Sequence, residues 1–250
     1  MASIPFGLDN LGLTCWFNSM LQALFSCDSF ITRIKNIESV NNIRKQDNSV
    51  CLQKLYNSYR KKAITYNHIN MTGQQDSHEG LMYFYDMYNL DMSQHRYRVT
   101  TKCNNCNNKI ISFDSNNTIV LPKQCDNIKN YIIKHENKIN DYKCELCKSN
   151  NVTQTRNLVY ASPILCILLP KYSVKTLIEY PNKFIIEGKK IPFNYKLKAV
   201  IMHYGDISGG HYTTEAIRDN KWYRFSDTSY NISDGKPKSE AYLLFYERHE

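Results

Sequence analysis

The sequence has little glycine and proline and lacks a long hydrophobic run. Its 250 residues include 9 Gly and 7 Pro, which excludes collagen-like and Pro/Gly low-complexity architectures. The longest uninterrupted apolar run, residues 164–169, is far shorter than the ~20 residues that a membrane-spanning helix needs. The first twelve residues contain neither a basic nor an apolar segment of the kind that begins a secretory signal. These absences predict a protein of the cytoplasm or nucleus that has no membrane partner.

The residues that are present predict a folded chain. Hydrophobic residues make up 42% of the sequence, and 19 residues are Tyr. At ~150 residues per domain, the length corresponds to one or two domains. The net charge is +9, but the basic residues are scattered and no nucleic-acid-binding motif is present. We therefore expect a solvated basic surface and consider nucleic acid an unlikely partner.

Helical patterns come first along the chain, and strand patterns follow. Apolar residues at helical spacing predict a buried helix over residues 17–25, a second near 81–88 and a weaker third over 50–62, whereas 33–48 has no clear pattern. Short β-branched or apolar runs predict the later strands. The expected strands are 99–101, 109–113, 118–121, 158–160, 164–169, 184–186, 197–202, 212–218, 222–225 and 242–246, with a turn at Asp219-Asn220. This order predicts an α+β fold with antiparallel strands.

Nine cysteines in a chain without a secretory signal favour metal binding or catalysis over disulfides. Two CxxC pairs are separated by 37 residues, and together they match the closed tetrahedral Cys₄ coordination of a structural zinc ion. Free thiols and a redox CxxC are the alternatives. We expect one structural zinc ion per chain, bound by Cys103, Cys106, Cys144 and Cys147.

A cysteine at a helix start and a histidine late in the chain are candidates for nucleophilic catalysis. Cys15 begins the first expected helix, where the helix dipole favours the thiolate. His211 follows Gly209-Gly210 at the start of an expected strand. Each residue alone is more often structural, but together they match the pattern of a Cys–His hydrolase.

Three sequence stretches resemble the ubiquitin-specific proteases, and they occur in the family's order. Residues 7–19, followed by Leu21-Gln22, resemble the cysteine box of that family, and residues 74–81 resemble its second box. Residues 203–212 and 222–225 resemble the histidine box, and the CxxC pairs fall where the family carries its zinc-bearing fingers. The resemblance implies a papain-like cysteine protease fold with a helical thumb (about 1–95), zinc-stapled β fingers (about 96–160) and an antiparallel β palm (about 161–250). It also implies a single catalytic domain, expected to be monomeric.

The resemblance further implies hydrolysis of the isopeptide bond after the C-terminal Gly-Gly of ubiquitin. Cys15 would be the nucleophile, His211 the general base, and Asn10 the donor to the oxyanion together with the Cys15 backbone N–H. Asp76 and Glu79, three residues apart on one helix face, would receive an arginine of the ubiquitin tail. The residues expected along the channel for this tail are His203, Gly209, Gly210 and Tyr212.

The sequence departs from the family pattern at the residue that orients the catalytic histidine. The family has Asp or Asn directly after the Phe of its W-x-x-F element, whereas this chain has Ser226 followed by Asp227. We expect Asp227 to orient His211, with Ser226 assisting. Gly80 replaces an aromatic residue of the second box, which predicts looser packing of that helix.

Other functions remain open at this stage. A ubiquitin-binding pseudoenzyme would have the same fold with a disabled triad, and Ser226 keeps that alternative open. A protease for another ubiquitin-like modifier with a Gly-Gly tail is a further alternative. A zinc-ribbon nucleic-acid binder is more distant, since only the net charge favours it. Frequent use of Asn, Ile, Lys and Tyr hints at an AT-rich genome of a virus or a protist.

Overall fold

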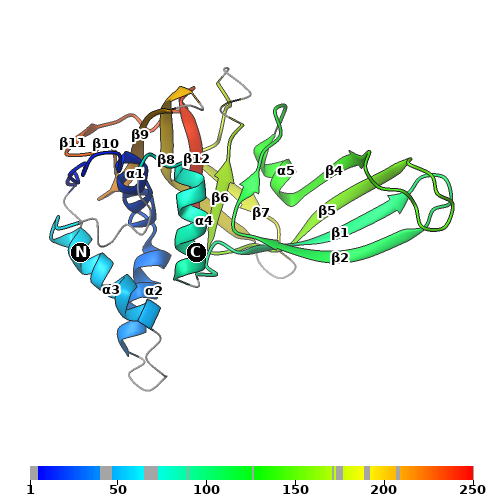
Figure 1. The fold of residues 1–250 in the computed structure, drawn as a ribbon, viewed down its shortest axis with the longest axis horizontal. Coiled ribbons are helices and arrows are strands. Elements are labelled where there is room, and N and C mark those ends of the chain that lie inside the picture. The colour runs from blue at the N-terminus through cyan, green and yellow to red at the C-terminus, as the bar shows by residue number, and fades with distance from the viewer. Residues whose placement is uncertain are drawn as a thin grey trace.

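The fold was obtained as a computed structural model of the 250-residue chain. The structure describes residues 5–39, 47–64, 73–88, 90–125, 127–170, 172, 177–188, 192–206 and 209–249, with side chains in these ranges other than those of 36–39 and 47–53. A helical region and a curved sheet pack together, and a second sheet reaches away from them (Figure 1). Within the described residues, no helix is both long and apolar enough to cross a membrane.

The helical thumb contains four helices, and α1 lies at its centre. Every residue of α1 is buried, which fits the apolar spacing in the sequence, and α1 packs against α4 and against the palm strands β8, β9 and β10. The thumb helices are α1 (Cys15–Leu24), α2 (Asp28–Ser39), α3 (Asp47–Arg60) and α4 (Ser77–Met87). They cover one face of the palm sheet and form a common core with it.

The fingers are a four-stranded antiparallel sheet in the order β2-β1-β5-β4. The strands are β1 (His95–Cys103), β2 (Lys109–Asn116), β4 (Lys134–Ile139) and β5 (Val152–Tyr160). Helix α5 (Ile128–Ile133) packs on one face of this sheet, where the Tyr97 hydroxyl donates to the Ile132 carbonyl at 2.7 Å. The sheet therefore has one face covered near its base and one face open.

The palm is an eight-stranded sheet in the order β11-β10-β9-β8-β12-β6-β3, with β7 pairing with β8 beside this path. Its strands are β3 (Ile119–Val120), β6 (Ile164–Leu168), β7 (Lys183–Ile186), β8 (Phe193–Asp206), β9 (Gly209–Arg218), β10 (Lys221–Ser226), β11 (Ser229–Ile232) and β12 (Ala241–His249). Strand β6 is buried on both faces, since Ile164 and Cys166 contact the thumb core whereas Leu165 and Ile167 contact a second core with α5. Burial on both faces explains why its sequence is apolar without alternation.

The α+β class and the thumb, fingers and palm are confirmed, and the structure adds elements that the sequence did not indicate. These are α2, α5, β4 and β11. Within the expected fingers range, β3 pairs parallel with β6 of the palm, and α5 contacts both the fingers sheet and the palm core. The expected turn at Asp219 and Asn220 is present, and both residues have left-handed φ angles of 49° and 61°.

Helix α4 packs tightly on α1, contrary to the loose packing expected from Gly80. A Cβ atom at position 80 would lie 2.5 Å from Cζ3 of the buried Trp16 ring. The large indole ring fills the space that a side chain at position 80 would take. The glycine and the tryptophan are therefore complementary in volume.

Candidate active site

Cys15 is the first residue of α1, and its side chain is only 3% exposed. Thr14 precedes it as the N-cap residue, and the Thr14 carbonyl accepts from the backbone N–H groups of Phe17 and Asn18. Burial raises the pKa of the Cys15 thiol, a hydrogen bond from the Tyr212 backbone lowers it, and the Asp227 carboxylate raises it, so that the pKa is raised overall. The sequence predicts a thiol acidified by the helix start, whereas in the structure burial is the largest influence on this thiol and raises its pKa.

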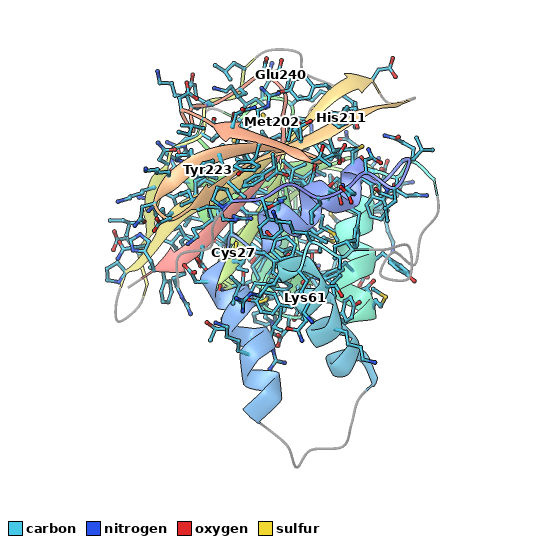
Figure 2. All side chains as sticks on the ribbon, turned by 90° about the vertical axis from the view of Figure 1, so that its left-hand side faces the viewer. Cys27, Lys61, Met202, His211, Tyr223 and Glu240 are labelled. Atoms are coloured by element: carbon cyan, nitrogen blue, oxygen red, sulfur yellow. The ribbon has the colours of Figure 1, made fainter. Side chains whose placement is uncertain are left out.

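His211 is the third residue of β9, directly before Tyr212, whose backbone contacts Cys15. Figure 2 shows His211 at one end of the palm strands, above the thumb helices. The His211 Nε2 atom lies 2.9 Å from the Ser226 Oγ atom at the end of β10. Cys15 and His211, which are far apart in the sequence, thus lie in one region, because α1 packs against β9 and the backbone of Tyr212, next to His211, contacts the Cys15 thiol.

Asp227 does not take the place that the sequence favoured for it. Its Oδ2 accepts a hydrogen bond from Asn10 Nδ2 at 2.9 Å, and its Oδ1 accepts one from Asn18 Nδ2 at 2.8 Å. The residue has a left-handed φ of 49°, and its carbonyl accepts from the Leu8 backbone N–H at 2.8 Å. This turn directs the carboxylate toward the N-terminal segment and α1, and Ser226 is the residue that contacts His211.

Asn10 is held from two sides. Its Oδ1 accepts from the Thr14 backbone N–H at 3.2 Å and from the Thr14 hydroxyl at 3.3 Å, whereas its Nδ2 donates to Asp227. These contacts fix which end of the amide is the donor. The amide lies at the entrance of α1, four residues before Thr14 and five before Cys15.

Asp76 is the N-cap residue of α4, and its carboxylate already accepts four hydrogen bonds. Oδ1 accepts from the backbone N–H groups of His78 and Glu79, and Oδ2 accepts from the Tyr212 hydroxyl at 3.0 Å and the Tyr242 hydroxyl at 2.7 Å. A carboxylate has about four acceptor positions, so Asp76 is saturated. The exposed Glu79 lies beside it on the first turn of α4.

The other residues expected to line the channel meet around this carboxylate. The buried His203 ring packs against Tyr212, with ring centroids 4.5 Å apart, and a Cβ atom on Gly210 would overlap His203 Nε2. A Cβ atom on Gly209 would meet nothing within 4 Å, so only Gly210 is required by close packing. The Gly210 carbonyl accepts from Gln74 Nε2 at 2.9 Å, which joins this loop to the segment before α4.

Sequence reasoning missed two residues of the site. Asn18 lies one helical turn after Cys15 and binds Asp227, and its spacing within the buried helix was the only available signal. Tyr242, on β12, contributes a hydroxyl to Asp76, and nothing in its own strand pattern distinguished it from a core residue. Both contacts depend on how distant segments pack.

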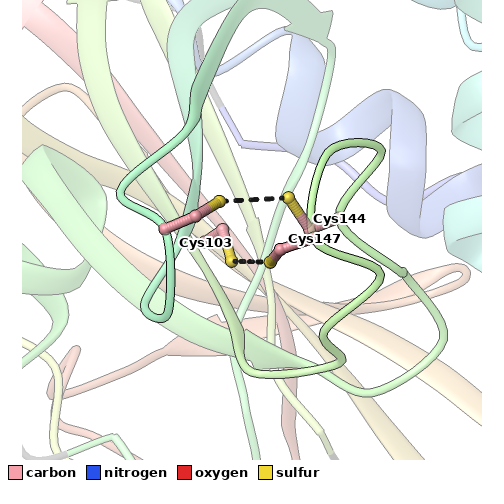
Figure 3. Close-up of side chains that lie close together, drawn as sticks. Cys103, Cys144 and Cys147 are labelled. Carbon is pink, nitrogen blue, oxygen red and sulfur yellow. Dashed lines mark hydrogen bonds between the residues drawn. The ribbon is translucent and has the colours of Figure 1, made fainter.

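The four cysteines of the CxxC pairs form one cluster that could hold a metal ion, with all four sulfur atoms within 4.8 Å of one another (Figure 3). Cys103 Sγ lies 3.5 Å from Cys147 Sγ, and Cys106 Sγ lies 3.6 Å from Cys144 Sγ. Around a tetrahedral zinc ion, with Zn–S bonds of about 2.3 Å, neighbouring sulfur atoms would be about 3.8 Å apart. The cluster therefore fits such an ion closely.

The two knuckles that carry these cysteines have the same backbone form. Asn107 and Lys148 both have a φ of 59°, and their N–H groups donate to the carbonyls of Cys103 and Cys144. Backbone N–H groups, chiefly that of Cys147, lower the pKa of Cys144 to about 6, and the backbone of Cys106 lowers the pKa of Cys103. For Cys106, the Asn108 backbone lowers the pKa, but the neighbouring thiols raise it to about 12, so the protons are shared unequally within the cluster. Thiolates are the form that metals bind, so the knuckles are suited to ligation.

The remaining cysteines whose side chains the structure describes lie outside the four-cysteine cluster. Cys27 and Cys166 are fully buried, and burial raises the pKa of Cys166 to about 12. Cys125 is half-buried, and the side chain of Cys51 lies outside the described residues. The two fully buried thiols fill core positions.

A buried cysteine at a helix start, a histidine on a facing strand and an amide at the entrance of that helix form the arrangement expected of a papain-like cysteine protease. The profile of the family described as "Ubiquitin carboxyl-terminal hydrolase" matches residues 6–246. The chain belongs to this family.

Individual relatives agree with this assignment. The chain is 33% identical over 126 residues to human ubiquitin carboxyl-terminal hydrolase 15, and this match covers 43% of this chain and 13% of that protein. It is 39% identical over 89 residues to ubiquitin carboxyl-terminal hydrolase 9 of Arabidopsis thaliana, and this match covers 31% of this chain and 10% of that protein. The chain thus matches only a small part of the length of these relatives.

Solved structures show the same fold. A SAGA DUB module of Ubp8, Sgf11, Sus1 and Sgf73 bound to monoubiquitin contains a chain that superposes with a TM-score of 0.75 at 21% identity, covering 98% of this chain and 69% of that chain. The Ubp8/Sgf11/Sus1/Sgf73 module bound to ubiquitin aldehyde gives a TM-score of 0.76 at 20% identity, covering 98% of this chain and 70% of that chain.

Proposed function

We propose that the protein is a thiol-dependent deubiquitinase that hydrolyses the isopeptide bond after the C-terminal Gly-Gly of ubiquitin. The observation that carries this proposal is the meeting of α1 and β9, where the Tyr212 backbone contacts the Cys15 thiol directly beside His211. Family membership and the ubiquitin-bound structures of the same fold support ubiquitin as the substrate.

Cys15 is the nucleophile in this proposal. Burial raises the pKa of this thiol and the thiolate is the nucleophilic form, so a base is needed to take the proton as attack begins. His211 takes that proton, the sulfur bonds to the carbonyl carbon of the terminal glycine, and the carbonyl oxygen becomes negatively charged. The imidazolium then protonates the leaving lysine amine, and water hydrolyses the remaining thioester.

Asn10 stabilises the negatively charged oxygen in this mechanism. One N–H of its amide donates to Asp227, which leaves the second N–H free to donate to the oxyanion together with the Cys15 backbone N–H. Asp227 therefore acts as a positioning residue for Asn10. A fixed donor loses little orientational freedom when the charge develops, which is why the anchoring contributes to the rate.

Ser226 orients His211 through the contact at Nε2. A hydroxyl fixes the direction of the ring, but it carries no charge to stabilise the imidazolium. The neutral partner is the one observation that favours a catalytically weak ubiquitin-binding protein as a second candidate. The labelling experiment below distinguishes the two.

The ubiquitin tail would pass over the first turn of α4. Glu79 is exposed and supplies the carboxylate for an arginine of this tail, whereas the saturated Asp76 positions Tyr212 and Tyr242. The open space at Gly209 allows an extended Gly-Gly strand to approach the backbone of β9. His203, buried behind Gly210, forms part of the wall of this channel.

Cys103, Cys106, Cys144 and Cys147 would hold one zinc ion in a structural role. Four thiolates leave no open coordination position, so the ion would stabilise the fold and take no part in the reaction. The fit of the sulfur positions to a tetrahedral site supports this proposal.

The experiment is to incubate the protein with ubiquitin that carries a thiol-reactive electrophile at its C-terminus and to measure the adduct by intact mass. We expect one ubiquitin per chain, attached at Cys15, and no adduct in Cys15→Ala. Tight binding without an adduct would identify the weak or inactive ubiquitin binder. If another Gly-Gly modifier formed the adduct and ubiquitin did not, the substrate would be that modifier and the proposed mechanism would stand.

A further inference from the structure

One face of the fingers sheet is strongly basic. Along β1 the buried residues Tyr97 and Val99 point to the side of α5, so that the alternating residues Arg96, Arg98 and Lys102 point to the opposite side. The four-stranded sheet reaches away from the palm (Figure 1), and α5 contacts the side of the sheet to which Tyr97 points. This opposite side is called the basic face below.

Strand pairing brings further cations onto the basic face. Lys102 pairs with Lys109 of β2 on one side and with Thr153 of β5 on the other. Thr153 in turn pairs with Lys138 of β4. In the same way, Arg98 pairs with Asn157 of β5, and Asn157 pairs with Lys134 of β4. Because directly paired residues point to the same side of a sheet, these residues share one face.

The basic face therefore carries six cations against one acidic residue. The cations are Arg96, Arg98, Lys102, Lys109, Lys134 and Lys138, and the acidic residue is Glu136, which accepts from the Thr155 hydroxyl at 3.0 Å. None of these six cations takes part in an ion pair within the described part of the chain. The charge is thus available to a partner.

Apolar side chains lie among these cations and are exposed to solvent. Phe113 is paired with Arg98 and is 56% exposed, and Ile111 is 51% exposed. The guanidinium carbon of Arg96 lies 4.7 Å from the centre of the Phe113 ring, which fixes the ring on this face. The basic face therefore combines charge with an exposed aromatic platform.

We propose that the basic face binds single-stranded nucleic acid. Side chains two residues apart on one face of a strand are about 6.6–6.8 Å apart, so the rows of cations can follow a polyanionic backbone while a base stacks on Phe113. An acidic peptide would use the cations but leave the exposed ring without a partner. The basic residues are scattered in the sequence, and only the strand pairing gathers them, which is why composition alone argued against this partner.

The experiment is to titrate the full chain into fluorescein-labelled U₂₀ RNA and T₂₀ DNA and to follow fluorescence anisotropy at several salt concentrations. We expect binding that weakens as salt rises. The triple substitution Lys102→Gln, Lys109→Gln and Lys138→Gln should reduce the slope of log K against log salt by about 2, at about 0.7 for each lost phosphate contact. Phe113→Ala keeps the charge and should weaken binding about tenfold.

Matched controls separate the basic face from the net charge. Lys54→Gln, Lys61→Gln and Lys221→Gln remove three exposed lysines elsewhere and should leave binding unchanged. Equal weakening by both triple variants, or an unchanged affinity in Phe113→Ala, would overturn the proposal. Tighter binding of polyglutamate than of either oligonucleotide would overturn it as well and assign the face to an acidic protein.

Discussion

At the scale of single residues, Asp227 connects two parts of the active site. Its carboxylate binds Asn10 in the segment before α1 and Asn18 within α1, so the amide and the nucleophile's helix share one anchor. In the proposed mechanism, removing the carboxylate of Asp227 frees the Asn10 amide, which has to point at the oxyanion. The effect of Asp227 on the reaction would then pass through Asn10, and a double-mutant cycle measures such a coupling.

We expect Asn10→Ala and Asp227→Ala each to lower kcat by about 10²–10³, the usual loss when an oxyanion donor is removed. Because Asp227 acts through Asn10, the double variant should be no more than about threefold slower than Asn10→Ala alone. Turnover of ubiquitin with a fluorogenic C-terminal amide gives these rates. Ser226→Ala is the control: we expect it to lower kcat less, and its fold-loss should multiply with that of Asn10→Ala in the double variant. If the fold-losses of Asp227→Ala and Asn10→Ala also multiplied fully, Asp227 would not act through Asn10.

The pH dependence of Cys15 reactivity follows from its surroundings. Burial and the Asp227 carboxylate both raise the pKa of the thiol, so the thiolate fraction rises only at higher pH. Asp227→Asn removes the negative charge, and the midpoint of alkylation by iodoacetamide should shift to lower pH. The measurement is made in a His211→Ala background, in which the thiol titrates without the imidazole. A shift toward higher pH would contradict this reading of the charge.

Single residues also show where sequence reasoning stops. Cys15 and His211 could be found because the residue types, a helix start and a strand start point to their chemistry. The choice between Ser226 and Asp227 could not be made, because it depends on the left-handed turn after β10 and on two amides from the other end of the fold. Adjacent residues in a chain can face opposite partners, and only the backbone geometry decides which.

At the scale of elements, α1 and α4 fit through the pairing of Trp16 with Gly80. Gly80→Ala should lower the free energy of unfolding in urea by about 1–3 kcal/mol, since its Cβ would overlap the Trp16 ring despite the better helix propensity of Ala. Trp16→Phe makes room, so the same glycine substitution should cost little in that background.

The matched control for this pair is Gly209→Ala, because a Cβ at that position meets nothing within 4 Å. Its free energy of unfolding should stay within about 0.5 kcal/mol of the parent value. If Gly80→Ala were equally costly with Trp16 and with Phe at position 16, the packing account would be wrong.

Elements differ in how far the sequence predicts them. Helix α1 is predictable because its apolar residues recur at helical spacing in the core. Helix α2 was missed because few of its residues are apolar; Phe30 and Ile34, one turn apart, reach the core, and the Ser29 backbone donates to Glu247 of β12 at 2.6 Å. Strand β4 was missed because its sequence is polar on both faces and its strand form depends on pairing with β5.

At the scale of the whole molecule, the fingers carry the cysteine cluster that could hold a metal ion. Both CxxC knuckles lie where strands end, and the fingers bury little apolar surface along β2. We expect about one zinc ion per purified chain, and its removal by a chelator should lower Tm by about 10 °C. Cys147→Ser should reproduce the loss, and Cys125→Ser, outside the cluster, is the control. Chains that keep their Tm without metal would show that the cluster is not a structural zinc site.

The position of β12 in the palm has a consequence for biosynthesis. This strand comes last among those described, yet it lies between β8 and β6 in the middle of the sheet, and its Tyr242 supplies a hydroxyl to the N-cap of α4. Until residues 241–249 have left the ribosome, β8 and β6 therefore lack the strand that pairs with both of them. Cys15 precedes β12 in the chain, and the Tyr242–Asp76 contact beside the candidate site can form only when β12 inserts. Under the proposed mechanism, we therefore expect Cys15 to gain its full reactivity only after β12 has inserted between β8 and β6.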